Sequence, residues 1–94
     1  MAILMTAELV GVTTEQYDAL TARLQALPGN PLAGCLSHVC VPAGPGLVIY
    51  DVWESEQALQ KFMGVLMPVA QELGLPPGKA PETVPVHAHW TPER

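Results

Sequence analysis

The hydrophobic positions of this chain follow two different periods. Apolar side chains recur at every second position in four stretches, which predict strands over residues 3–12, 34–41, 47–53 and 83–90. Between the first and second stretches, and between the third and fourth, they recur at every third or fourth position, as on one face of a helix. The stretch LVIYDVW is the richest in β-branched and aromatic residues and is the strongest strand. The predicted order of elements is therefore βαββαβ.

Both predicted helices carry start and stop signals. Thr13 and Gln16 have the spacing of a capping box, which begins the first helix, and the sequence PGNP ends it. Ser55 is the expected N-cap of the second helix, and Gly74 follows its last turn. Pro68 lies inside the second helix and is expected to kink it or to split off its last turn.

This order predicts an α+β, ferredoxin-like fold, an antiparallel four-stranded sheet with both helices on one face. Residues 34–41 and 47–53 flank the turn sequence PAGPG and are expected to form a hairpin. Pro85 places the last strand at an edge of the sheet, because proline cannot donate a hydrogen bond to a strand ladder. The 94 residues have the length of one domain, residues 1–94.

Composition adds an expectation about partners. Hydrophobic residues make up 49% of the chain and charged residues only 14%, too few to cover the large relative surface of a small domain. A second copy is therefore expected to cover part of it. The net charge of −5, with scattered Lys and Arg, argues against a nucleic-acid partner. The N-terminus lacks the basic residues of a signal peptide, and prolines interrupt the longest uncharged window. We expect a cytoplasmic homodimer without membrane contact.

Alternation along the strands divides the sheet into two faces. One face is uniformly apolar, includes Met5 and Tyr50, and is expected to lie under the helices. The other face mixes apolar and polar groups: Thr6, Glu8, Leu36, His38, Ile49, Asp51, Trp53, His87 and His89. Such a mixture suits the wall of a ligand cavity between two sheets. This assignment requires strands without a bulge, which would reverse the parity of every residue beyond it.

The mixed face carries all three histidines and supplies the candidate chemistry. The catalytic candidates are His38, His87, His89, Asp51 and Glu8. The substrate-binding candidates are Trp53, Thr6, Leu36 and Ile49. Histidine titrates near neutral pH, and a carboxylate beside it fixes its tautomer, so this set suits acid–base chemistry on a hydrophobic small molecule. Alternatively, His87 and His89 would bind a metal together with His38 and a carboxylate. The favoured interpretation uses neither metal nor cofactor.

The cysteines offer no motif. Cys35 and Cys40 are five residues apart, an odd offset that places them on opposite faces of one regular strand. That spacing matches neither a redox CxxC motif nor a zinc ribbon. Two free, buried thiols are the expected state.

The run from Val48 to Leu59, VIYDVWESEQAL, resembles the strand-to-helix segment of the dimeric α+β barrel superfamily, especially its antibiotic biosynthesis monooxygenase branch. There, an aromatic residue, an acid, a spacer and a tryptophan precede an acidic helix start and an Ala-Leu or Ala-Phe pair. The βαββαβ order extends the resemblance to about Trp90. It implies a homodimer whose two sheets pack into a barrel, with a pocket in each subunit between sheet and helices.

The resemblance carries over to some residues and not to others. Trp53 matches the tryptophan that lines the pocket in cofactor-free monooxygenases and in haem-degrading members. The asparagine that those enzymes use on the first strand is absent, and Thr6 and Glu8 stand there instead. The predicted second helix has no histidine to ligate haem. Polyketide cyclases of the superfamily place histidine and carboxylate groups in the pocket, as here. The resemblance thus implies a cofactor-independent cyclase, isomerase or monooxygenase, with a non-catalytic ligand-binding dimer as the alternative.

Overall fold

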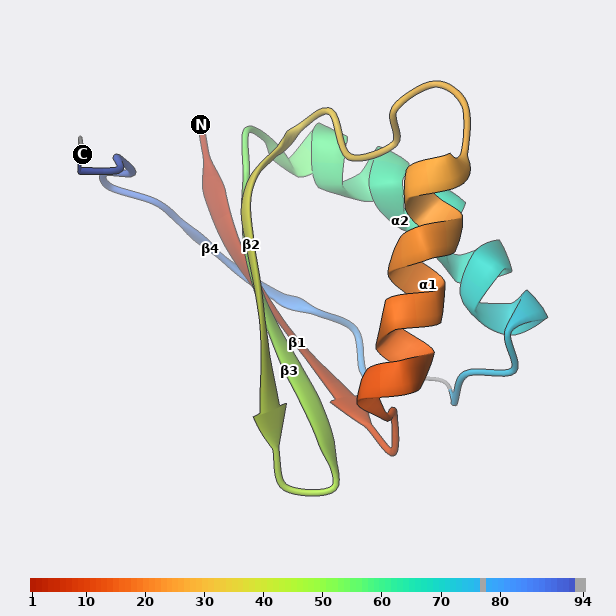
Figure 1. Cartoon of the computed structure of the whole chain (residues 1–94). Coiled ribbons are helices and arrows are strands. Elements are labelled where there is room, and N and C mark those ends of the chain that lie inside the picture. The colour runs from red at the N-terminus through yellow and green to blue at the C-terminus, as the bar shows by residue number, and fades with distance from the viewer. Residues whose placement is uncertain (77, 93–94) are drawn as a thin grey trace.

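A computed structural model describes residues 1–76 and 78–92 and has the order expected from the sequence. Its elements are β1 (Ile3–Val10), α1 (Thr14–Ala26), β2 (Cys35–Ala43), β3 (Gly46–Trp53), α2 (Glu56–Glu72) and β4 (Glu82–Pro85). The strands form one antiparallel sheet in the order β2-β3-β1-β4, and both helices cover the same face (Figure 1). The predicted α+β, ferredoxin-like fold is confirmed. No helix in the described part of the chain is long and apolar enough to cross a membrane.

The last strand lies at an edge, as Pro85 indicated, but it is shorter than expected. β4 pairs with β1 over four residues and ends at Pro85, instead of extending to residue 90. The backbone N–H of Val86 still donates to the carbonyl of Ala2 at 3.0 Å, and then the pairing stops. The segment that follows runs to the side of the sheet away from the helices (Figure 1).

The helix boundaries follow the sequence signals. Thr13 forms the predicted capping box, in which its hydroxyl accepts from the Gln16 N–H at 3.1 Å and the Gln16 side chain accepts from the Thr13 N–H at 2.9 Å. Ser55 caps α2 by accepting from the Ala58 N–H at 3.1 Å. Gly74, with φ of 70°, follows the end of α2. Helix α2 stays continuous through Pro68, so its last turn is not split off.

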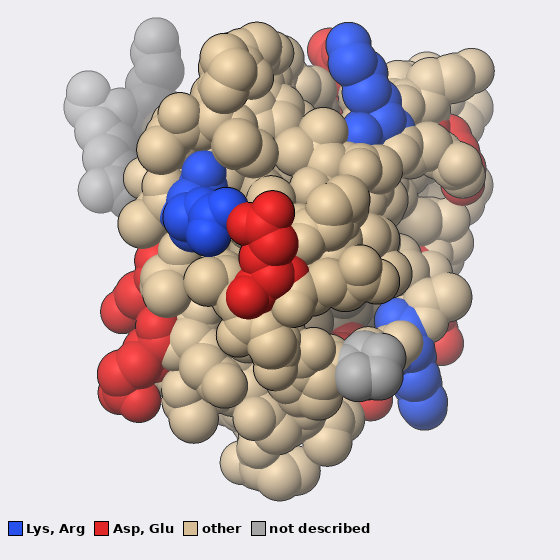
Figure 2. All heavy atoms as spheres, turned by 90° about the vertical axis from the view of Figure 1, so that its right-hand side faces the viewer, with Lys and Arg blue, Asp and Glu red and all other residues tan. Residues whose placement is uncertain are grey.

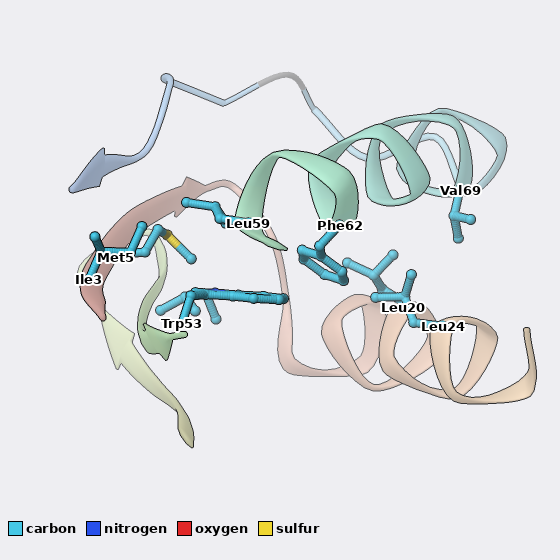
Figure 3. Packing of buried hydrophobic residues seen from close by; sticks show 9 residues of the cluster. Ile3, Met5, Leu20, Leu24, Trp53, Leu59, Phe62 and Val69 are labelled. Carbon is cyan, nitrogen blue, oxygen red and sulfur yellow. The ribbon is translucent and has the colours of Figure 1, made fainter. Parts of the chain in front are cut away.

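The core lies between the sheet and the two helices (Figure 3). Trp53 is completely buried at its centre and packs against Phe62 of α2, with ring centroids 5.0 Å apart. The other buried residues of this cluster are Ile3, Met5, Leu20, Leu24, Ile49, Leu59 and Val69. Burial of this apolar surface holds the helices on the sheet and provides the main driving force for the fold.

The expected division of strand β3 into two faces is wrong. Ile49, Asp51 and Trp53 point toward the helices and are buried, whereas Tyr50 is 43% exposed on the opposite, open face. Both faces of β3 carry large apolar side chains, so composition could not distinguish them. The carboxylate of Asp51 is tolerated under the helices because neighbouring side chains donate hydrogen bonds to both of its oxygens.

Strand β2 was assigned to the wrong faces together with β3: His38 was expected to share a face with Asp51 and does, but that face lies under the helices. A bulge adds a separate error at the start of β2. The pairing with β3 shifts between Cys35 and Ser37, so Leu36 is an extra residue. Beyond it, His38 lies opposite Asp51 and shares the helix-facing side of the sheet. Cys35 and Cys40 lie opposite Trp53 and Ile49 and therefore share one face, contrary to expectation. Both are free thiols and only partly buried.

The face of the sheet away from the helices is mostly apolar and has nothing packed on it within the described chain. Its exposed apolar members are Val10, Val39, Val41, Tyr50 and Val84, from all four strands. Its polar members include Thr6, Glu8 and Glu82. We call this surface the open face. Monomeric proteins seldom expose a contiguous apolar surface spanning a whole sheet, so the open face is a candidate interface.

Candidate functional site

Four side chains form a line of hydrogen bonds from the core to the surface. The indole Nε1–H of Trp53 donates to Asp51 Oδ2 at 3.1 Å. His38 Nδ1 lies 2.6 Å from Asp51 Oδ1, and His38 Nε2 is hydrogen-bonded to the hydroxyl of Tyr17. Asp51 is 3% exposed, whereas the His38 side chain is 41% exposed. The line therefore joins a buried carboxylate to a solvent-accessible imidazole.

Strand pairing and helix packing position these groups. Trp53 and Asp51 are two apart on β3 and share its inner face, and His38 lies directly opposite Asp51 on β2. Tyr17 comes from the first turns of α1, which crosses this face of the sheet (Figure 1). The site is thus assembled from two adjacent strands and one helix, and the capping box at Thr13 fixes where that helix begins.

The buried carboxylate determines the proton arrangement on His38. An ionised Asp51 can only accept hydrogen bonds, so Nδ1 of His38 must carry the proton that the two groups share. In the neutral imidazole, Nε2 is then the free base and accepts from the Tyr17 hydroxyl. When Nε2 takes up a proton, the imidazolium forms an ion pair with Asp51. This arrangement can accept a proton at Nε2 and pair the resulting positive charge with the Asp51 carboxylate.

Burial affects the other titratable groups around this line. Burial raises the pKa of Tyr17, and the charges of Asp51 and Asp18 raise it further. A side-chain hydrogen bond with Thr21 acts in the opposite direction and lowers this pKa. Burial also raises the pKa of Cys35 to about 11 and raises that of Cys40. The phenol and both thiols therefore remain protonated at neutral pH.

The structure brings together only part of the predicted set. His38, Asp51 and Trp53 are joined, and Ile49 packs in the core beside them. Thr6 and Glu8 lie on the open face, because they pair opposite Tyr50 and Val48. The remaining candidates, Leu36, His87 and His89, are exposed, Leu36 at the bulge and the two histidines beyond the end of β4.

Two expectations about His87 and His89 are therefore corrected. They do not lie on a strand, since β4 ends at Pro85, and they do not share a sheet face with His38. Across residues 1–76 and 78–92, no three His, Cys, Asp or Glu side chains are close enough to hold a metal ion.

Tyr17 was not among the residues expected at the site. Its place in the apolar stripe of α1, with Leu20 and Leu24, gave it the pattern of a core residue. A tyrosine in such a stripe still needs a partner for its hydroxyl, which was the available signal. That partner could not be identified while His38 was assigned to the opposite face.

Two hollows of the described surface lie away from this line. One, of about 300 Å³, lies between the start of α2 and β4 and is lined by Ser55, Gln57 and Thr83 among others. The other, of about 180 Å³, lies near the β2–β3 turn beside Glu8 and Val48. Neither hollow is lined by His38, Asp51 or Tyr17, so the line of hydrogen bonds reaches the surface outside both hollows.

The charged groups on the helix side of the molecule are dispersed. Figure 2 shows this side, where acidic and basic groups are scattered over a mostly uncharged surface. The guanidinium of Arg23, on α1, is bonded to Glu72. In the described ranges, no Lys or Arg side chain is hydrogen-bonded to Tyr17, His38 or Asp51.

Several solved structures share this architecture. Rv0793 from Mycobacterium tuberculosis superimposes with a TM-score of 0.61 at 20% identity, covering 97% of this chain and all of its own. A protein from Chloroflexus aurantiacus J-10-fl, whose name assigns it to the antibiotic biosynthesis monooxygenases, gives 0.57 at 23% identity, covering 96% of this chain and 98% of its own. This chain has the antibiotic biosynthesis monooxygenase fold.

A third structure with this fold has a described activity. SnoaB from Streptomyces nogalater, a cofactor-independent oxygenase, matches the chain with a TM-score of 0.56 at 17% identity, covering 96% of this chain and 94% of SnoaB. No protein-family model and no curated protein matches the sequence. The resemblance noted in the sequence is thus confirmed for the antibiotic biosynthesis monooxygenase fold, and the chemistry has to be argued from the residues of this chain.

Proposed function

We propose that this protein is a cofactor-independent enzyme that removes a proton from a hydrophobic aromatic or polyketide-like molecule, with His38 as the base. The observation that carries the proposal is the 2.6 Å contact between His38 Nδ1 and the buried Asp51 carboxylate. A carboxylate held in the core orients the imidazole and stabilises the imidazolium that proton abstraction creates.

Proton abstraction is the step that the candidate reactions have in common. A cyclase or isomerase needs a carbanion or enolate, and a cofactor-independent oxygenase needs an electron-rich substrate anion that itself reacts with oxygen. The fold shared with SnoaB, which is a cofactor-independent oxygenase, supports this class of chemistry. The charges of Asp51 and Asp18 near Tyr17 favour a neutral weak acid over a permanently anionic substrate.

We also propose that the functional unit is a homodimer formed through the open face. Val39, Tyr50 and Val84 are each at least 43% exposed there and lie on three different strands. Two such faces packed together would form the barrel implied by the sequence resemblance. Burial of these side chains would supply a hydrophobic driving force, and it would account for the small number of charged residues.

The proton-abstraction step can be tested with anthrone, a neutral tricyclic compound with an acidic C–H group. In deuterated buffer without oxygen, wild-type protein is expected to speed deuterium incorporation at that carbon, detected by mass spectrometry. His38→Ala should lose this acceleration, by roughly 10²-fold or more for a general base. Lys61→Gln, an exposed change on α2, is the control for altered surface charge.

The same sample separates the reaction types when air is admitted. Oxygen uptake with formation of anthraquinone and water would identify an oxygenase, and exchange without uptake would indicate an isomerase or cyclase. Binding of anthrone without faster exchange would instead support the non-catalytic ligand-binding alternative and contradict the proposal.

A further inference from the structure

We propose that Tyr17 transfers the proton between the bound substrate and His38, an inference that rests on the function proposed above. The base is not open to a ligand in this structure, because the Tyr17 hydroxyl already occupies His38 Nε2. The other imidazole nitrogen is held by Asp51 at 2.6 Å. A substrate proton therefore reaches the imidazole through the phenol.

The ring geometry suits proton transfer along this contact. The phenol and imidazole planes are within 7° of parallel, and the centroids are 5.9 Å apart. The two rings are thus nearly parallel and are joined by the hydrogen bond between the phenol hydroxyl and Nε2.

The relay balances without any co-reactant. The substrate C–H or O–H bond breaks and its proton bonds to the Tyr17 oxygen, while the original Tyr17 proton bonds to His38 Nε2. The electron pair of the broken bond stays on the substrate as an enolate or phenolate. The products of the step are this anion, a neutral tyrosine and an imidazolium paired with the Asp51 carboxylate. The reverse transfer returns the proton to the product.

The environment of Tyr17 selects a concerted transfer over a stored phenolate. Burial raises the pKa of this phenol, and the charges of Asp51 and Asp18 raise it further. A phenolate would therefore be disfavoured at neutral pH, and the hydroxyl has to gain one proton as it gives up the other. Tyr17 is then a catalytic residue that contacts the substrate, and Asp51 is a positioning residue that acts through His38.

One alternative role predicts the opposite effect of a single substitution. If Tyr17 merely blocked Nε2 and had to move aside for the substrate, then Tyr17→Phe would expose the base. The anthrone exchange rate should fall by about 10²-fold in this variant if Tyr17 relays the proton, with little change in KM, because the ring is kept. Lys61→Gln, an exposed change on α2 away from both the site and the open face, is the control. An unchanged or faster rate in Tyr17→Phe would overturn the inference.

A second measurement tests the Tyr17–His38 contact without any substrate. The chain has three histidines, so the double substitution H87Q and H89Q leaves His38 as the sole imidazole. In that background, the rate at which diethyl pyrocarbonate acylates His38 should rise several-fold on Tyr17→Phe, because Nε2 loses its hydroxyl partner. An equal rate would overturn the relay whatever the enzyme does. If acylation responds as expected but the wild type exchanges no anthrone proton, the contact stands and the proposed function with this probe fails.

Discussion

Asp51 is the residue on which the site depends most. It is 3% exposed and has no Lys or Arg among its described hydrogen-bond partners, and both its oxygens are satisfied by N–H donors, from Trp53 and from His38. Because both oxygens accept hydrogen bonds, burial of this carboxylate costs only a modest amount of folding free energy. Removing its charge would leave the N–H groups of Trp53 and His38 facing a different group. It is therefore both a structural and a functional group.

We expect Asp51→Asn to lower the free energy of unfolding by about 1–3 kcal/mol, the cost of a buried donor without an acceptor. An asparagine oxygen can accept from Trp53, but its amide then faces the Nδ1–H of His38. The variant should also slow anthrone proton exchange, because the imidazole loses its fixed tautomer. Urea unfolding monitored by tryptophan fluorescence measures the first effect. Asp18→Asn should change stability by less than about 0.5 kcal/mol, and equal losses in both variants would contradict this assignment.

Cys35 gives a pH prediction of definite sign. Burial raises the pKa of its thiol from 9.0 to about 11 in the folded protein, so the folded state holds this proton more tightly than the unfolded chain. The contribution of this thiol to the free energy of unfolding is therefore fully present below pH 9.0 and is lost as the pH rises toward about 11. In urea unfolding across this window, the stability of wild type should fall more steeply than that of Cys35→Ala. Parallel curves would show that the thiol does not contribute.

Sequence reasoning identified part of the site at this scale. His38, Asp51 and Trp53 were expected to share one face of the sheet, and they do, but it is the face under the helices. The grouping could be predicted because residues two apart on a strand point the same way. The place of Tyr17 in the site could not be predicted, since its hydrogen-bond partner depends on which face of the sheet the helices cover.

The elements themselves were predictable because their signals are local. A capping box, an N-cap serine and a glycine after the last turn each act within a few residues, and all three were confirmed. Which face of each strand packs against the helices does not depend on local signals. Both faces of β3 are apolar, and the bulge at Leu36 reverses the parity of β2 without any proline or glycine to signal it.

Helix α1 connects fold stability to the site, because it carries Tyr17. We expect Thr13→Ala to cost about 1 kcal/mol of unfolding free energy, the usual loss of a side-chain N-cap. The first turn of α1 should also loosen, so acylation of His38 should become faster in the background without the other histidines. Thr14→Ala is the matched control, since its hydroxyl contacts only the adjacent Glu15 side chain. Equal stability of the two variants would show that the capping box contributes nothing.

At the scale of the whole molecule, the open face has nothing packed on it within the described residues. It extends over all four strands, on the side opposite the helices, and its exposed side chains are mostly aliphatic. The low charge content indicated an interface, but sequence alone assigned the wrong residues to it. Tyr50 was expected in the core and is instead near the middle of this surface.

We expect Val39→Glu to convert a dimer into a monomer, because it would place a charge in the proposed interface beside Tyr50. Val39 is 53% exposed in the single chain, so the substitution should leave the monomer folded. Met67→Glu is the matched control, because Met67 is 51% exposed on α2, on the other side of the molecule. Sedimentation velocity distinguishes the states, and a wild-type monomer at micromolar concentration would contradict the proposed dimer.

The bulge at Leu36 has a consequence for comparing this chain with others of the same architecture. Residues on either side of Leu36 already pair with consecutive residues of β3, so its removal would leave a regular strand with His38 still opposite Asp51. A homologue without the bulge is therefore expected to align through a one-residue gap at this position. An alignment that omits the gap would match His38 to a side chain on the opposite face, and a shared histidine could go unnoticed.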